Sequence, residues 1–164
     1  MKNLFILLFS FGLLVPAMAQ EKLSEVVITA TKYKYLSATS SDEVAVPVEI
    51  LQDKVANFYV KDADFYRDDY DLYHVTFYIP EGKILAAYDG EGNILRTVEK
   101  YKNIALPKAV SADILKKYPN WTVSKDIYLV NYHQDKGATK KYKIKLTNGD
   151  KTIRIKCDEN GIIQ

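Results

Sequence analysis

Apolar and polar residues alternate one by one along three stretches of the chain. Every second residue is apolar or aromatic across 73–79, 141–146 and 152–157, and the residues between them are mostly polar or basic. Because successive side chains of a strand point to opposite faces of a sheet, this period of two predicts strands with one buried and one exposed face. A glycine follows the first stretch at Gly82 and separates the other two at Gly149, which favours antiparallel hairpins.

A helical pattern precedes each group of strands. Pro47 stands where the first turn of a helix tolerates proline, and Pro107 opens a second such segment that Pro119 ends. The first apolar stripe consists of Ile50, Leu51, Val55 and Phe58, and the second of Ala109, Val110, Ile114 and Leu115. Both stripes have the spacing of an amphipathic helix that covers one face of a sheet.

The two halves of the chain resemble each other. Tyr142 follows Tyr73 by 69 positions, and Ile144 follows Val75 by the same separation. Upstream, Pro107 follows Pro47 by only 60 positions, and an insertion within 121–139 accounts for the difference. Internal similarity of this kind predicts a repeated structural unit.

These patterns predict an α+β fold of two tandem repeats. Each repeat is a helix followed by an antiparallel meander, with the helix packed on one face of its own sheet. We place repeat 1 at 44–105 and repeat 2 at 106–164. The preceding residues 20–43 are predicted to be an N-terminal strand, within 25–35, and a polar linker, and the strand would add to the edge of either sheet.

The first nineteen residues have the features of a cleavable export signal. Lys2 is a basic start, residues 4–15 form an apolar core, and Ala17-Met18-Ala19 is a cleavage site before Gln20. The mature chain would begin without the cysteine that a lipoprotein requires. The single Cys157 excludes an intrachain disulfide. We therefore expect residues 1–19 to be a signal peptide and the protein to be periplasmic or secreted, without stable insertion into a membrane.

Charge is distributed unevenly between the halves. Residues 20–106 carry 10 Lys/Arg and 15 Asp/Glu, whereas residues 107–164 carry 12 and 6, a balance of −5 against +6. The net charge of the whole chain is +2, which lacks the basic excess of a nucleic-acid-binding protein. The asymmetry indicates either a basic interaction surface or two halves that attract each other.

The outward positions of the predicted strands are the candidate binding residues. In the second repeat they are basic: Lys141, Lys143, Lys145, Arg154 and Lys156. In the first repeat they are amphipathic: His74, Thr76 and Tyr78. Like charges on neighbouring strands cost stability unless something compensates them, so an anionic partner, such as an envelope or secreted protein, is one interpretation. Docking against the acidic half and protection of exposed strands from aggregation are the others.

Short motifs in the second repeat resemble a known family. Leu106-Pro107, the helix end at Lys117-Tyr118-Pro119 and the terminal turn at 158–161 are similar to PepSY-like domains of exported Bacteroidetes-type proteins. These domains resemble the tandem repeat of the β-lactamase inhibitor protein. The resemblance covers residues 44–164 and implies a protein-binding or inhibitory module outside the cytoplasm. Separately, residues 25–32 are similar to the short segment with which TonB-dependent receptors engage their energising partner.

Residues suited to catalysis or metal binding are few. The chain has two histidines and one cysteine, without the spacing of a zinc site, a nucleophile motif or a nucleotide-binding loop. The loop at 89–93 begins like a calcium loop, but Ile94 and Lys100 stand where that loop needs Gly and Glu. We expect a non-enzymatic protein or peptide binder without cofactor or metal. The alternative is a small-ligand or ion-binding envelope sensor that uses the acidic segment 62–71.

Overall fold

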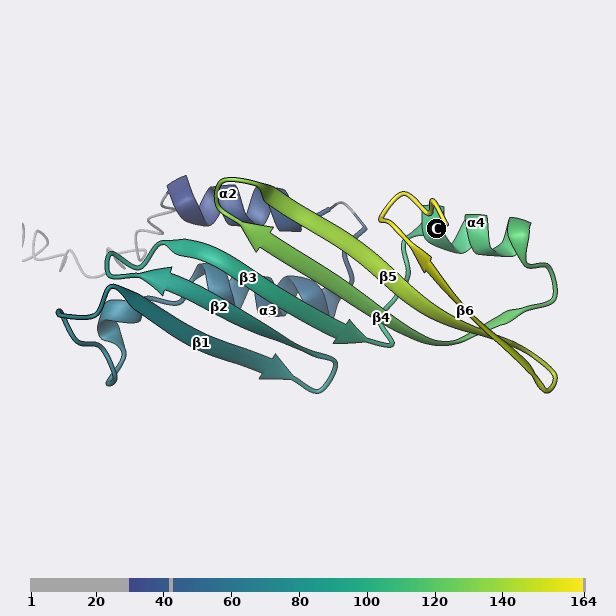
Figure 1. The fold of residues 1–164 in the computed structure, drawn as a ribbon, viewed down its shortest axis with the longest axis horizontal. Coiled ribbons are helices and arrows are strands. Elements are labelled where there is room, and N and C mark those ends of the chain that lie inside the picture. Colours follow the sequence, from purple (N-terminus) through teal and green to yellow (C-terminus); the bar gives the residue numbers. More distant parts are fainter. Residues whose placement is uncertain (1–29, 42, 164) are drawn as a thin grey trace, which may run out of the picture.

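The computed structural model describes residues 30–41 and 43–163, which form three α-helices and one six-stranded sheet. The elements are α2 (Ala30–Thr39), α3 (Val46–Ala56), the 3-10 helix η1 (Val60–Asp62), β1 (Leu72–Ile79), β2 (Gly82–Asp89), β3 (Ile94–Lys102), α4 (Lys108–Lys117), β4 (Thr122–His133), β5 (Gly137–Asn148) and β6 (Lys151–Cys157). The sheet is antiparallel throughout, and each strand pairs with the next one in the chain (Figure 1). The predicted α+β class is confirmed.

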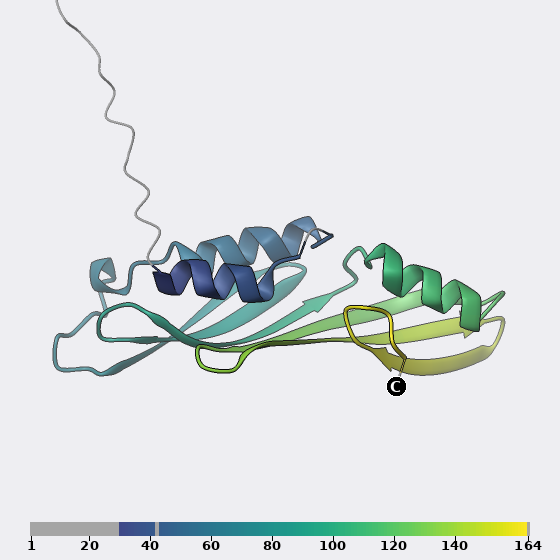
Figure 2. The ribbon, with the colours of Figure 1, turned by 90° about the horizontal axis from the view of Figure 1, so that it is seen from above.

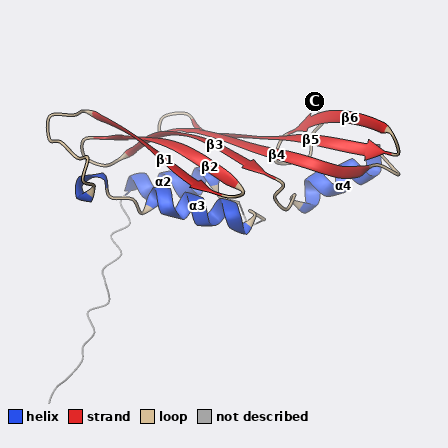
Figure 3. Cartoon of the chain, turned by 90° about the horizontal axis from the view of Figure 1, so that it is seen from below, coloured by secondary structure: helices blue, strands red, loops and turns tan. Residues whose placement is uncertain are grey.

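All three helices lie on the same side of the sheet (Figures 2 and 3). Helices α2 and α3 lie side by side over one end of the sheet, and α4 lies over the other end, beside β4–β6. The molecule therefore has two layers, and its opposite face carries no helix in the described part of the chain. None of the helices within the described ranges is long and apolar enough to cross a bilayer.

The predicted alternation of the strands is confirmed. Tyr73, Tyr142, Ile144 and Leu146 point inward and are buried, whereas the residues between them face away from the helices. Cys157 also faces inward, as expected, and is 2% exposed. The core is thus a layer of aromatic and aliphatic side chains between the sheet and the helices.

The helix stripes are correct only in part. In α3 the buried face runs through Val48, Leu51, Gln52 and Val55, at intervals of three and four residues, so Ile50 lies off that face and is 46% exposed. In α4, Val110 and Ile114 are buried as predicted. Leu115, one residue further, is 68% exposed, and Ala109, at the start of the predicted stripe, is exposed too.

The predicted N-terminal strand is wrong where the structure describes it, and the predicted linker is wrong over 36–39. Residues 30–39 form helix α2, with Tyr35 and Thr39 on its buried side four residues apart. Many Thr and Tyr residues gave this segment the composition of a strand. The hydroxyl of Tyr35, which donates to buried Glu99, anchors it as a helix instead. The rest of the predicted strand, the similarity of residues 25–32 to a receptor segment and the signal peptide involve residues 1–29, which lie outside the described residues.

The predicted separation into two sheets is also wrong, because β3 pairs with β4 and joins all strands into one layer. Helix α3 precedes β1–β3, and α4 precedes β4–β6. The residues matched at a separation of 69 therefore lie on non-equivalent strands. Strand β1 is the first strand after α3, whereas β5 is the second strand after α4. Their likeness reflects the alternation that every strand of this sheet needs to fill the same buried layer.

The two predicted positions on α3 provide a test of the packing. Leu51→Ala removes a fully buried side chain, and we expect it to lower the free energy of unfolding by about 2–5 kcal/mol. Ile50→Ala removes a side chain of similar size from the exposed side of the same helix, and we expect a change below about 1 kcal/mol. Urea denaturation followed by circular dichroism measures both. Equal losses would show that the packing of α3 is misassigned.

Candidate binding site on the helix-free face

The helix-free face consists of the outward-facing positions of the six strands. The strand register arranges these positions in rows that cross the sheet, because directly paired residues of antiparallel strands point to the same side. The first row is Lys125, Lys145 and Arg154; the second is Lys102, Ile127, Lys143 and Lys156; the third is Tyr78, Lys83, Lys100, Leu129 and Lys141. Three adjacent rows therefore contain nine cationic side chains and no Asp or Glu.

We refer to these nine residues as the cationic zone: Lys83, Lys100, Lys102, Lys125, Lys141, Lys143, Lys145, Arg154 and Lys156. Lys145 is half-buried and the others are exposed. Within the described ranges, no carboxylate lies within 4.0 Å of the charged group of any of them. Neighbouring strands are only about 4.8 Å apart, so their charges repel one another with little internal compensation.

A β-bulge completes the first row. The register of β4 against β5 shifts between Val123 and Lys125, which places Lys125 opposite Lys145. The hydroxyl of Ser124, at the bulge, donates to the carbonyl oxygen of Lys145 at 3.1 Å. Bulges of this kind often redirect a side chain at a functional surface. Here the bulge adds a cation beside Lys145 and Arg154.

Shallow grooves run between the cationic side chains. The first, of about 380 Å³, is lined by cations of β4, β5 and β6 around Ile127. The second, of about 430 Å³, lies between Lys83, Lys100 and the apolar residues Leu85, Val98 and Leu129. An apolar floor with a charged rim suits a ligand that carries both apolar groups and negative charge.

Beyond the third row the face changes character. The fourth row, which we call the neutral row, contains Thr76, Leu85, Val98, Asn131 and Thr139 and no charged residue. The fifth row brings His74 beside Arg96, with Nε2 and a guanidinium nitrogen 3.4 Å apart. The face therefore has a strongly basic part, an uncharged row and, beyond that row, the cation Arg96.

The structure gathers the predicted site residues unequally. Lys141, Lys143, Lys145, Arg154 and Lys156 lie together in the cationic zone. His74, Thr76 and Tyr78 lie on the same face but at its opposite edge, on β1, and only Tyr78 shares a row with the lysines. The binding of a partner by these residues stays a prediction.

Four cations of the zone were missed from the sequence: Lys83, Lys100, Lys102 and Lys125. Lys100 and Lys102 continue a period of two that includes Arg96 and Val98, so an outward basic strand was visible in that segment. Their position beside the second half of the chain was not visible, because it depends on the pairing of β3 with β4.

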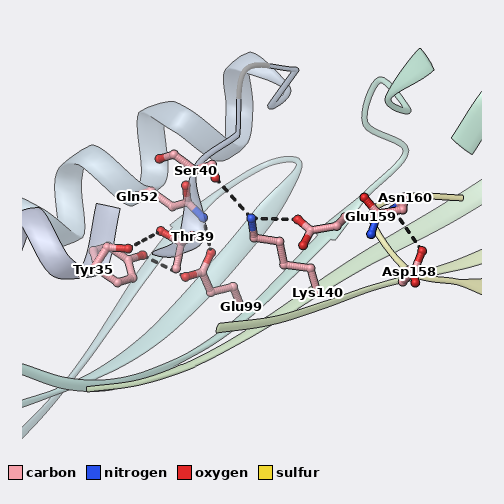
Figure 4. Close-up of polar contacts among 9 residues, drawn as sticks. All are labelled: Tyr35, Thr39, Ser40, Gln52, Glu99, Lys140, Asp158, Glu159 and Asn160. Atoms are coloured by element: carbon pink, nitrogen blue, oxygen red, sulfur yellow. Dashed lines mark hydrogen bonds and ion pairs between the residues drawn. The ribbon is translucent and has the colours of Figure 1, made fainter. Parts of the chain in front are cut away.

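The helix-covered face holds a buried carboxylate, Glu99 on β3 (Figure 4). The hydroxyl of Tyr35 donates to Oε1 at 2.8 Å and the amide of Gln52 donates to Oε2 at 2.9 Å. Thr97 and Tyr101, on the same strand, donate one further hydrogen bond to each oxygen. Four donors saturate the carboxylate, so we assign it a structural role. It ties α2 and α3 to the sheet.

A second polar link joins the residue after α2 to the last turn of the described chain (Figure 4). The ammonium group of Lys140, on β5, donates to the carbonyl oxygen of Ser40 at 3.2 Å and pairs with a carboxylate oxygen of Glu159 at 2.9 Å. Its side chain is only 8% exposed. Lys140 is thus a structural cation on the helix-covered side, unlike the neighbouring Lys141.

The acidic segment 62–71 lies between η1 and the start of β1. Its five aspartates are exposed: Asp62, Asp64, Asp68, Asp69 and Asp71. No group of three or more His, Cys, Asp or Glu side chains suited to holding a metal ion is found among the described residues.

Burial of Glu99 makes the free energy of unfolding depend on pH. Burial raises the pKa of Glu99 above its usual 4.5, although its four hydrogen bonds act in the opposite direction. Between the unfolded and the folded pKa the native state holds the extra proton, so stability falls as pH rises through this window. Each unit by which the folded pKa exceeds the unfolded pKa lowers the free energy of unfolding by about 1.4 kcal/mol at neutral pH.

Glu99→Gln, which cannot ionise, should lack this part of the pH dependence. Urea unfolding from pH 4 upward measures it as the difference between wild type and variant, with the wild type relatively more stable in acid. The comparison also removes the contribution of Asp126, whose pKa is raised by burial too. If the difference in unfolding free energy between wild type and variant did not change with pH, the raised pKa of Glu99 would be contradicted.

Comparison with known proteins gives no relative: no family model, curated protein or solved structure matches the chain. The resemblance to PepSY-like domains stays a prediction that rests on the sequence motifs.

Proposed function

We propose that the protein is an exported, non-catalytic binding module that holds an acidic segment of a partner protein on its helix-free face. The observation that carries the proposal is the cationic zone, in which nine basic side chains from five strands share one surface without a carboxylate among them. A partner that supplies negative charge would relieve their mutual repulsion on binding.

The chemistry of the face defines the partner further. Ile127 and Leu129 lie between lysines of the second and third rows, and Leu85 and Val98 form the apolar centre of the neutral row. Acidic residues alone would leave these apolar groups uncovered. A segment that combines Asp or Glu with apolar side chains matches both features.

The support of the sheet suits recognition through a fixed surface. Each strand of the cationic zone is paired on at least one side, and the buried layer and helices lie behind it. A surface that is already ordered loses little conformational entropy when a partner binds. Binding would therefore depend on complementarity of charge and shape.

The few reactive side chains also favour a binding role. Cys157 is buried, and burial raises the pKa of its thiol to about 11, so the thiol stays protonated at neutral pH. His133 lies 3.8 Å from Asp135, an exposed neighbour in the β4–β5 turn, and His74 lies beside Arg96. Neither pair includes a nucleophile that it could activate.

The proposal includes the repeated architecture and the family resemblance. The order of α3 with β1–β3 and of α4 with β4–β6 supports two helix-plus-meander units, here fused into one sheet. The PepSY-like motifs of the second unit support the proposed family resemblance. An exported position follows from the signal-like residues 1–19.

The test replaces charge within the zone and outside it. The triple variant Lys143→Glu, Lys145→Glu, Arg154→Glu reverses the centre of the zone. Lys54→Glu, Lys61→Glu, Lys116→Glu changes the net charge equally at exposed positions on the helix-bearing side and serves as the matched control. Fluorescence anisotropy with a labelled peptide of repeating Glu-Glu-Leu measures Kd.

We expect the zone variant to weaken binding at least tenfold, about 1.4 kcal/mol, and the control to stay within about twofold. Binding by the wild type should also weaken steeply with salt, because several exposed charges act together. Equal weakening in both variants would show that net charge alone attracts the peptide, and the proposal would then fail.

A further inference from the structure

Strand β1 forms an edge of the sheet with unusual properties. Its eight residues, LYHVTFYI, include no Lys, Arg, Asp, Glu or Pro. All eight pair with β2 in one uninterrupted register, and no strand pairs with its other side within the described ranges (Figure 1). Such an edge presents unpaired backbone N–H and C=O groups that readily accept another strand.

The opposite edge of the sheet is protected. Strand β6 carries Lys151, Arg154 and Lys156, and its end is closed by a bridge between Cys157 and Ile163. Charged residues, especially lysine, are a common protection of edges against pairing. The contrast shows that only β1 has the features of an edge that is free to pair.

Apolar surface is also left uncovered along β1. Val75, Phe77 and Ile79 face the helix side but are only half-buried, whereas Ile84 and Ala86, their neighbours on β2, are fully buried. Tyr78, on the helix-free face, is 79% exposed. Pairing along this edge would cover the apolar row together with the backbone groups.

We propose that β1 pairs antiparallel with β1 of a second copy of this chain, around a two-fold axis. Charge favours a second copy as the occupant. Antiparallel pairing places the start of one β1, preceded by Asp68, Asp69 and Asp71, beside the end of the other. There Lys83, Lys100 and Lys102 line one groove together with Glu81, so this end is cationic on balance. The two ends of the edge are thus complementary to each other in charge.

The alternation of β1 limits the register to axes that pass through a single residue, and we place the axis at Thr76, the central residue of 73–79. Paired residues must lie on the same face, and an axis at Thr76 satisfies this for all of 73–79, with His74 opposite Tyr78 of the second copy. This arrangement sets the helices of both copies on one side. The result is a continuous twelve-stranded sheet with two cationic zones on one face, which would increase the avidity for a repeated acidic partner.

The test introduces the protection that β6 already has. Sedimentation velocity of the purified protein at micromolar concentration should show a dimer for the wild type and a monomer for Thr76→Lys. Thr152→Lys makes the same exposed substitution on the same face of the opposite edge strand and should remain dimeric. A monomeric wild type, or dimers that persist in Thr76→Lys, would overturn the proposal.

A cross-link tests the register without weakening the edge. Thr76→Cys should form a disulfide-linked dimer on mild oxidation, because the two cysteines would face each other across the axis. Thr152→Cys should form none above the wild-type level, and the native Cys157 is buried. Absence of the cross-link in a protein that folds normally by circular dichroism would refute the pairing at Thr76. The same result is expected if residues 1–29 of the same chain occupy the edge, and it would overturn the proposal in that case too.

Discussion

The pairing of β3 with β4 is the constraint on which the rest of this structure depends. It joins Arg96–Lys102 to Ile127–His133 through seven residue pairs and turns two meanders into one sheet. Because the rows of the helix-free face cross this junction, the lysines of β2 and β3 lie beside those of β5 and β6 only through it. The nine cations share one surface because β3 pairs with β4.

The helix-covered side reinforces the same junction. Glu99 lies on β3 opposite Val130 on β4, and its hydrogen bonds reach Tyr35 on α2 and Gln52 on α3. A buried carboxylate is costly unless it is well satisfied, and here it fixes two helices above the strand that joins the halves. Stability and the position of the cationic zone therefore depend on the same segment of chain.

Local patterns predicted the parts of the fold that local physics determines. Alternation over 73–79 and 141–146 identified the strands and their buried faces, since a period of two depends only on the pleat. The stripes of α3 and α4 were less secure, because one residue along a helix is a rotation of about 100° and several apolar side chains compete for the core. Val48 and Val110 are buried in the core, whereas Ile50 and Leu115 are exposed.

Non-local pairing was beyond the sequence. Nothing in Lys100 or Lys102 indicates that β3 lies beside β4, so only the basic residues close together in the chain were predicted as one surface. Helix α2 was missed because its anchoring partner, Glu99, is 64 residues away from Tyr35. The bulge that directs Lys125 is likewise set by the strand beside it.

The ammonium group of Lys140 has a mechanical consequence. It binds both the carbonyl group that follows α2 and the carboxylate of Glu159 in the last turn. The two segments therefore share one nitrogen atom as their partner. Peeling away the first helix would strip the final turn of its counter-ion, and the reverse also holds. Loss of either contact should therefore weaken the other, although Ser40 and Glu159 lie 119 positions apart in the sequence.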